Sequence, residues 1–141
     1  MFVGSGLTSI DIYEKVEIPE YCFALCKDLK SVKIHNSLVG INEGAFSDCS
    51  KLTNVTMHQT VGYLADQVFY NCTALKTIKL PNNEFTLGGY CFYQCTNLEE
   101  VIFDVNTKIS QINGSVFEAT NLSRFVVDPN NTNYSNNCFY R

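Results

Sequence analysis

The residues of this chain that could do chemistry are its seven cysteines and two histidines. Four of the cysteines recur at one constant interval, at Cys26, Cys49, Cys72 and Cys95. Cysteines in such numbers occur in disulfide frameworks and in zinc sites. The regular interval favours a different interpretation, because residues that recur at one fixed period occupy equivalent packing positions in a repeat.

The histidines follow the same interval, since His58 stands as far after His35 as Cys49 stands after Cys26. On neighbouring coils of a repeat they would lie about 5 Å from each other, close enough to share a metal ion. A metal site needs a further ligand, and the equivalent position on the next coil is Pro81. Neither histidine is placed beside one of the regularly spaced cysteines, so no nucleophile with its base can be assembled. We therefore expect surface histidines, no metal, no cofactor and no enzymatic activity.

The repeat that positions these residues carries a phenylalanine at the same interval, at Phe23, Phe46, Phe69 and Phe92. It also carries a leucine followed by two residues, an apolar residue, one more residue and another apolar residue. Six copies of this spacing begin at Leu7, Leu29, Leu52, Leu75, Leu98 and Leu122. The alternation at the end of each copy predicts a half-buried β-strand. Six such strands would stack into one parallel sheet about 25 to 30 Å long.

A second apolar position lies five residues before each phenylalanine and predicts the return half of each coil. It is occupied by Ile18, Ile41, Leu64, Leu87 and Ile112. The segment from this position to the cysteine is too short for a helix, so we expect a turn or a single 3₁₀-like turn. Each coil then has two inward-pointing edges, and the phenylalanine fills the space between them.

Within such coils, neighbouring cysteines of the column lie about 5 Å apart with parallel side chains, which do not converge as a disulfide requires. We expect buried free thiols that pack as small apolar groups. The pairs Cys22/Cys26 and Cys91/Cys95 are three coils apart, about 15 Å, so one zinc ion cannot bridge them. A local Cys91–Cys95 disulfide is the remaining alternative.

The complete pattern is a phenylalanine, two residues, a cysteine, two residues and a leucine, then the two apolar strand positions and a turn with an occasional proline (Pro19, Pro81, Pro129). It resembles the BspA-like, or Treponema pallidum-type, leucine-rich repeat family over about residues 7–139. The resemblance implies a right-handed, β-dominated leucine-rich repeat solenoid of five to six coils, with residues 1–141 as one domain. It also implies a cell-surface or secreted protein that acts in adhesion or host-protein binding, with no catalytic residues.

The fifth unit departs from the pattern. Phe117 stands two positions later than the interval from Phe92 predicts, its cysteine position is not a cysteine, and Leu122 follows it one residue early. We expect this coil to bulge or tighten. Neither end of the chain carries the polar cap that shields the last coil of a solenoid. These features predict a fragment or short relative of a longer array, and end-to-end self-association.

The strand residues that alternate outward form a candidate ligand-binding face. It comprises Lys33, Thr56, Lys79, Glu100, Ile102, Asp104, Arg124 and Val126. The middle column of this face ends in Ile102 and Val126, so apolar residues are exposed beside charged ones, which is typical of a surface that contacts another protein. The predicted function is non-catalytic protein binding or adhesion. The alternative is a rigid spacer in a longer surface protein, with no ligand of its own.

Composition narrows the choice of partner. The formal net charge is -4 and the pI is near 5.0, whereas a nucleic-acid partner normally requires a basic face. No apolar run approaches the ~20 residues of a transmembrane helix, so no direct membrane insertion is expected. The first residues also lack the basic, apolar and small-residue order of a signal peptide. We expect a protein partner, either a host protein or a cell-surface protein.

Overall fold

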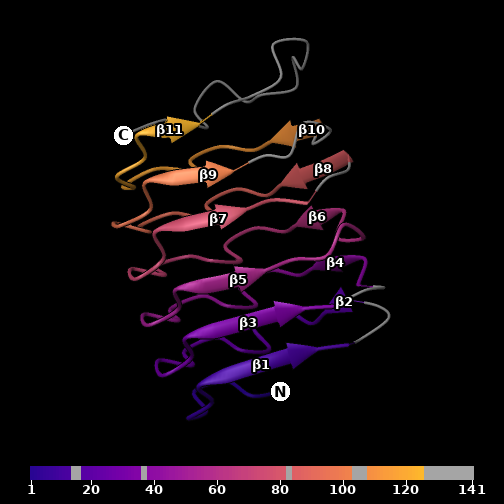
Figure 1. The fold of residues 1–141 in the computed structure, drawn as a ribbon, viewed down its shortest axis with the longest axis vertical. Helices are drawn as coiled ribbons and strands as arrows, with labels where there is room; N and C mark the ends of the chain where they lie inside the picture. Colours follow the sequence, from indigo (N-terminus) through magenta and orange to yellow (C-terminus); the bar gives the residue numbers. More distant parts are fainter. Residues whose placement is uncertain (14–16, 36–37, 82–83, 103–107, 126–141) are drawn as a thin grey trace.

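The chain winds into a solenoid in which each coil contributes one strand to a front side and one to a return side (Figure 1). The structure is a computed structural model that describes residues 1–13, 17–35, 38–81, 84–102 and 108–125. The front strands are β1 (Ser9–Ile12), β3 (Ser31–Ile34), β5 (Asn54–Thr56), β7 (Thr77–Lys79), β9 (Glu100–Ile102) and β11 (Arg124–Phe125). The return strands are β2 (Glu17–Ile18), β4 (Gly40–Ile41), β6 (Tyr63–Leu64), β8 (Glu84–Leu87) and β10 (Lys108–Ile112).

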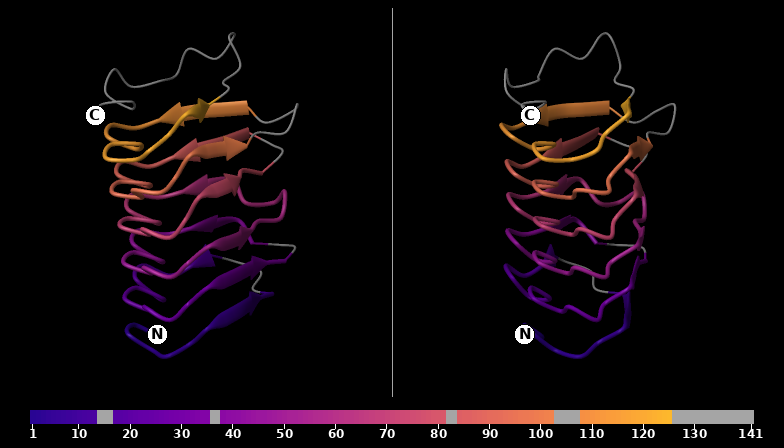
Figure 2. Two further views of the ribbon diagram at one scale, coloured as in Figure 1. Left: turned by 60° about the vertical axis from the view of Figure 1, so that its left-hand side comes forward. Right: turned by 90° about the vertical axis from the view of Figure 1, so that its left-hand side faces the viewer.

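All paired strands run parallel, because each coil follows the path of the coil before it (Figure 2). The return strands form one sheet in the order β10-β8-β6-β4-β2. From β2 to β10 the described chain completes four turns, and the front strands on either side extend it to five turns between β1 and β11. The parallel-sheet solenoid predicted from the repeat interval is confirmed.

Alternation along the strands separates core from surface as expected. In β3, Val32 and Ile34 are buried while Lys33 between them is exposed. A strand's period of two residues sends neighbouring side chains to opposite faces, so one face can be apolar. On the return side, the predicted inward residues Ile18, Ile41, Leu64, Leu87 and Ile112 are all buried. Both inward edges of the coil are therefore confirmed.

Phenylalanine rings stack from coil to coil through the middle of the core. The stacked pairs are Phe2–Phe23, Phe23–Phe46, Phe46–Phe69, Phe69–Phe92 and Phe92–Phe117, with ring centroids 5.4 to 5.7 Å apart and planes 3° to 8° from parallel. A centroid distance above the strand spacing means that each ring is offset from the next, which is the favoured arrangement for stacked aromatics. The predicted row of phenylalanines exists, and it also includes Phe2 and Phe117.

The front side corrects one expectation, because it is not a single six-stranded sheet. It divides into one sheet of β1, β3 and β5 and another of β7, β9 and β11. In the first sheet His35, just after β3, donates its N–H to the carbonyl of Ile12 at 2.9 Å. The equivalent residue after β7 is Pro81, which has no N–H to donate towards β5. The proline therefore removes a ladder bond where the two sheets meet.

Each turn around a phenylalanine contains two residues in the left-handed backbone conformation. They stand two residues before it (Tyr21, Gly44, Gln67, Tyr90, Ser115) and two residues after it (Leu25, Asp48, Asn71, Gln94, Ala119), with φ between 51° and 62°. Around Phe23, the amides of Tyr21, Phe23 and Leu25 all donate to carbonyls of the next coil at 2.8 to 2.9 Å. These bonds satisfy the buried polar groups of the turn, which offsets the strain of a left-handed non-glycine residue.

The fifth unit contains the predicted irregularity. The pairing of β10 with β8 shifts register between Ile109 and Gln111, so β10 carries one more residue than its neighbour at that point. Such a bulge accommodates an extra residue without moving the inward side chains to the outer face. Ile109 and Ile112 consequently both remain buried on either side of the shift.

Replacing Phe69 by alanine should lower the free energy of unfolding by about 3 to 5 kcal/mol, because it opens a cavity in the middle of the ring stack. Replacing the exposed Lys79 by alanine is the matched control and should change it by less than about 0.5 kcal/mol. Chemical denaturation measures both. Equal effects would contradict the assignment of inward and outward positions.

Candidate functional site

Four residues of the predicted binding face occupy one outward column across both front sheets. Lys33 is in register with Thr56, and Lys79 is in register with Ile102. All four are exposed, and the Ile102 side chain is unusual among them because it is large and apolar with 38% of its surface accessible. The strand alternation therefore sends these four side chains to solvent, as predicted.

The neighbouring column contains a second pair of predicted face residues. Arg124 is in register with Glu100, and its Nε lies 3.6 Å from Glu100 Oε1. Both side chains reach solvent, so the ion pair adds little stability but fixes opposite charges beside Ile102. Asp104 and Val126, the other two predicted face residues, lie outside the described residues.

A groove of about 320 Å³ lies where the two front sheets meet. Its lining residues are Val55, Thr56, Met57, Gln59, Lys79, Leu80 and Pro81. Val55 and Met57 are only partly buried, whereas the equivalent residues of the preceding coil, Val32 and Ile34, are almost fully covered. The break in the ladder thus exposes part of the core, on the face proposed from the sequence. The repeat pattern did not predict this groove, although Pro81, which cannot donate a backbone hydrogen bond, could have indicated it.

The two histidines do not share a site. His35 Nε2 lies 3.0 Å from Asp11 Oδ1, and its ring stacks on Tyr13 with centroids 4.0 Å apart. His58 Nδ1 lies 3.4 Å from Thr60 Oγ1. Each imidazole thus has its own neighbours at the coil surface. Among the described residues, no group of three metal-ligating side chains comes together.

The cysteine column has a role that sequence analysis missed. Each thiol of the column donates a hydrogen bond to the carbonyl of the phenylalanine in the preceding coil, as in Cys49 to Phe23 and Cys72 to Phe46, both at 3.2 Å. Cys26 and Cys95 make the same bond at 3.1 Å to Phe2 and Phe69. The thiols are therefore buried and free, as expected, but they also satisfy buried carbonyls.

Burial makes these thiols poor nucleophiles. It raises the pKa of Cys49 and of Cys95 to about 12, and it raises the pKa of Cys72 well above the ordinary value for a thiol. Burial likewise raises the pKa of Cys91, which is a free thiol rather than the partner of Cys95 in a disulfide. A thiolate is the reactive form, so a raised pKa suppresses alkylation, oxidation and metal binding alike.

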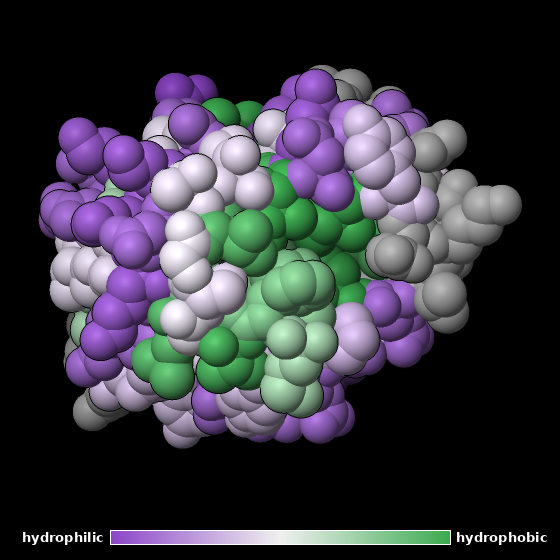
Figure 3. Space-filling model, turned by 90° about the horizontal axis from the view of Figure 1, so that it is seen from below, coloured by the Kyte–Doolittle hydropathy of each residue, from purple (hydrophilic) through white to green (hydrophobic). Residues whose placement is uncertain are grey.

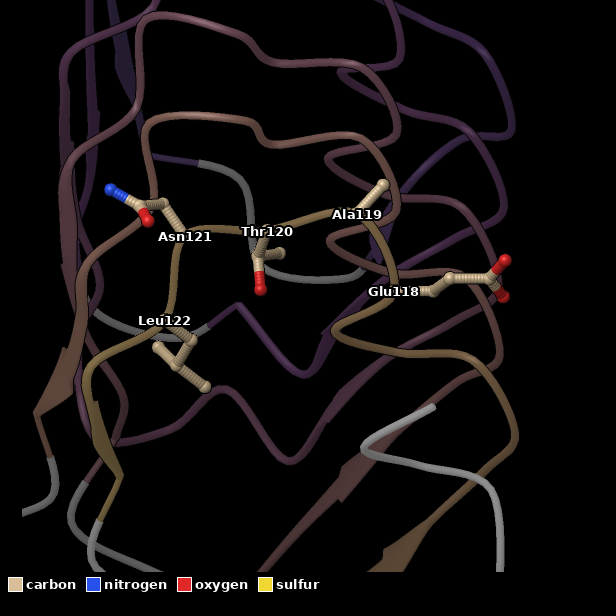
Figure 4. A pocket seen from close by; sticks show the side chains of 5 residues that line it. All are labelled: Glu118, Ala119, Thr120, Asn121 and Leu122. Atoms are coloured by element: carbon tan, nitrogen blue, oxygen red, sulfur yellow. The ribbon is translucent and has the colours of Figure 1, made fainter. Parts of the chain in front are cut away.

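The fifth unit replaces the cysteine by Thr120, whose hydroxyl donates to the carbonyl of its own Phe117 at 2.7 Å. The hydrogen bond to the preceding coil is thereby exchanged for one within the turn. A small pocket of about 210 Å³ lies at this point, lined by residues 118–122 (Figure 4). Its lining residues are Glu118, Ala119, Thr120, Asn121 and Leu122.

One family of known proteins matches most of this chain. The family described as the BspA type leucine rich repeat region matches residues 16–141 in six copies. The chain belongs to this family. Leucine-rich repeat solenoids are generally interaction or structural modules rather than enzymes. Comparison with curated proteins gives no match.

Three solved structures share the fold of this BspA-type chain. The leucine-rich repeat protein of T. pallidum (TpLRR) has a TM-score of 0.74 and 22% identity, over 82% of this chain and 56% of that one. A leucine-rich repeat protein from Eubacterium ventriosum has a TM-score of 0.76 and 24% identity, over 89% and 34%. One from Bacteroides ovatus has a TM-score of 0.62 and 23% identity, over 84% and 36%. The chain thus spans about a third to just over half of these proteins.

The described part of this BspA-type solenoid contains no helix with the length and apolarity needed to span a membrane.

The return side of this BspA-type solenoid carries a polar network across three coils. Tyr63 donates to Asn42 Oδ1 at 3.0 Å, and Asn42 Nδ2 donates to Glu17 Oε2 at 3.2 Å. The ring of Tyr63 reaches Asn42 by crossing Gly40, where a Cβ atom would overlap it. A side chain at position 40 would therefore have to displace the Tyr63 ring of the neighbouring coil. The repeat interval could not predict this network, because its three residues do not recur together in the other coils.

Electrostatic effects follow from the same network. Burial, followed by the nearby Glu17 carboxylate, raises the pKa of Tyr63 to about 12. The neighbouring Tyr63 hydroxyl and then the hydrogen bond from Asn42 lower the pKa of Glu17 from its ordinary value of 4.5. A carboxyl with a lowered pKa contributes stability above its unfolded value, and this contribution is lost as the pH falls through the lowered value.

Native-state alkylation tests the burial of the cysteine column. Iodoacetamide should modify Cys49, Cys72 and Cys95 of the folded protein at pH 8 at least about 100-fold more slowly than in denaturant, because thiolate is scarce and access is blocked. Mass spectrometry of the peptides reads each site separately. Similar rates in the folded and denatured protein would contradict a column of buried thiols.

Substitution of Gly40 by alanine tests the return-side network. It should lower the free energy of unfolding by about 1 to 3 kcal/mol, because the new methyl group displaces the Tyr63 ring. Gly62→Ala is the matched control, since a Cβ there meets only the carbonyl oxygen of Val39 at an ordinary 3.6 Å. Adding Tyr63→Ala to Gly40→Ala should recover part of the loss in a double-mutant cycle. No coupling between the two positions would refute the steric explanation.

Proposed function

We propose that this chain is a non-catalytic protein-binding module, acting in adhesion, whose ligand platform is the front face of the solenoid. The observation that carries the proposal is the groove at the junction of the front sheets, beside exposed Lys79 and Ile102. A partly open apolar floor with a charged rim is the composition of an anchor pocket in protein interfaces. The rest of the front face supplies a broad, regular surface around it.

The chemistry of the face indicates the chemistry of its partner. The lysine ammonium groups of Lys33 and Lys79 stand in the same outward column as the apolar side chain of Ile102. A complementary segment would insert an aliphatic or aromatic side chain over Val55 and Met57 and present a carboxylate to Lys79. Acidic groups would also be steered towards the two lysines over about a Debye length.

The proposed setting is the cell surface or the extracellular space, where the partner would be a host protein or another surface protein. This follows from membership of the BspA-type family, whose proteins typically occupy that setting. The acidic pI near 5.0 is compatible with protein partners and unfavourable for nucleic acid.

A rigid spacer without a ligand is the second candidate function. It is supported by the ring stack, which continues without interruption from Phe2 to Phe117. Repeats that contact only their neighbours form stiff rods whose length grows with the number of coils. The two functions predict different results for substitutions on the front face. A binding module should lose affinity for its partner, whereas a spacer should be unaffected.

Binding to a panel of purified serum and matrix proteins tests the proposal. For any protein bound by the wild type, the double variant Lys79→Ala/Ile102→Ala should weaken binding at least about tenfold, since hot-spot truncations remove more than about 1.4 kcal/mol. Thr86→Ala/Gln111→Ala on the return side is the matched control and should bind as the wild type does. Biolayer interferometry measures affinity, and thermal unfolding verifies the fold. Equal affinity of all three proteins would favour the spacer.

A further inference from the structure

The tight turns around the phenylalanines form a separate surface of the solenoid, which we call the turn side. It consists of residues 20–25, 43–48, 66–71, 89–94 and 114–119. The turns stack on one another, because amides of one turn donate to carbonyls of the next, as Gln67 does to Gly89 at 2.9 Å. Residues at the same position of the turn therefore lie above each other from coil to coil.

Three tyrosine rings form a cluster on the turn side. The rings of Tyr70 and Tyr93 stack across neighbouring coils with centroids 5.3 Å apart, and Tyr90 meets Tyr93 edge-on at 5.5 Å. Seen from below, apolar residues gather in the middle of the molecule and polar residues surround them (Figure 3). The Tyr90 ring lies outside this apolar middle, since 45% of its surface is accessible. The cluster is therefore an aromatic surface separate from the core.

Packing within the solenoid does not use the polar ends of these rings. The hydroxyl groups of Tyr70, Tyr90 and Tyr93 make no hydrogen bond to the described part of the chain. Tyr21, at the turn position of Tyr90, instead donates to the Glu43 carboxylate of the next coil at 2.9 Å. Tyrosines with an accessible ring and an unused hydroxyl are typical of contact surfaces, because one side chain supplies both apolar area and a hydrogen bond.

The turn side also carries a concentrated negative charge. It contains none of the ten lysines and arginines of the chain, and its five acidic residues are Glu20, Glu43, Asp48, Asp66 and Glu118. Its formal charge is thus more negative than the net charge of -4 of the whole chain. Among the described residues, ion pairs form at Asp11, Asp28 and Glu100, none of which lies in these turns.

Carboxylates border the tyrosine cluster in the coils before and after it. Asp66 Oδ1 accepts from the amide of Gly89, the residue before Tyr90, at 2.7 Å. Glu118 occupies the turn position of Tyr93 in the following coil. A cation at this place would be attracted by the faces of the rings and by the carboxylates on either side of them.

We propose that the turn side binds a basic segment of a partner protein, with an arginine side chain placed on the rings of Tyr90 and Tyr93. Arginine fits this surface better than lysine, because its planar guanidinium stacks on a ring and donates two N–H groups to one carboxylate. From Asp48 to Glu118 the acidic turns span three coil spacings, about 15 Å. An extended segment covers that length with about five residues, of which two or three would be arginines.

This surface differs from the front face in the charge of its partner. The front groove presents Lys79 and would select an acidic segment, whereas the turn side would select a basic one. No residue belongs to both surfaces, so one chain could hold two partners of opposite charge at the same time.

Fluorescence anisotropy with three labelled peptides of about ten residues tests the proposal. In the peptides glycine alternates with arginine, with lysine or with glutamate. At about 50 mM salt the wild type should bind the arginine peptide, bind the lysine peptide at least about twofold more weakly, and not bind the glutamate peptide. Tyr90→Ala/Tyr93→Ala should raise the Kd of the arginine peptide at least about threefold. Tyr13→Ala is the matched control, since Tyr13 is 67% exposed outside the turns, and should bind as the wild type does.

A second pair of variants removes charge while it keeps the hydrogen bonds of the fold. Asp66→Asn retains the oxygen that accepts from Gly89, so Asp66→Asn/Glu118→Gln should fold like the wild type, as thermal unfolding would show. It should raise the Kd at least about threefold and reduce the salt dependence of binding. Glu84→Gln/Glu99→Gln removes the same charge from exposed positions outside the turns and should change the Kd by less than about twofold.

The outcomes separate a specific surface from attraction between opposite charges. A wild type that does not bind the arginine peptide overturns the proposal. Equal weakening by the turn-side variants and their controls also overturns it, because the peptide would then respond to net charge alone. Equal affinity for the arginine and lysine peptides has the same consequence, since the tyrosine rings would then play no part in recognition.

Discussion

This structure depends on one constraint: the phenylalanine and the cysteine of each coil must contact the phenylalanine of the coil before it. Each phenylalanine ring lies over the next at 5.4 to 5.7 Å, and each column cysteine bonds the carbonyl of the phenylalanine in the coil before it. Ring stacking excludes water from the core, and the thiol hydrogen bond satisfies a backbone carbonyl that this packing buries. Together they require every coil to follow the path of its predecessor.

This constraint explains how much could be predicted from the sequence. Phe46, Cys49 and Leu52 recur because each must meet its own equivalent, so a regular interval in the sequence becomes a straight column in space. Features that combine different residue types do not recur at a fixed interval, so the sequence pattern does not indicate them. The network of Tyr63, Asn42 and Glu17 uses three different side chains from three coils. The left-handed turns are equally hidden, since Tyr21, Gln67 and Leu25 share no backbone preference.

Part of the candidate binding face could also be predicted, because its residues follow the repeat interval. Alternation placed Lys33, Thr56, Lys79 and Ile102 on the outside, because the inward residues on either side of them are fixed by the core. The groove was not predicted, since it arises from a missing hydrogen bond at Pro81 rather than from a repeated residue. Pro81, just after a strand, thus interrupts an otherwise regular sheet, and the groove lies at that interruption.

A solenoid separates its surfaces by function because its core runs along a single axis. The inward residues determine stacking along that axis, whereas the outward residues of the front face are free to vary without changing it. Ligand binding on the front face would use Lys79, Ile102 and the groove between the sheets. A substitution on this face should therefore change contacts with a partner without disturbing the columns of side chains that hold the coils together.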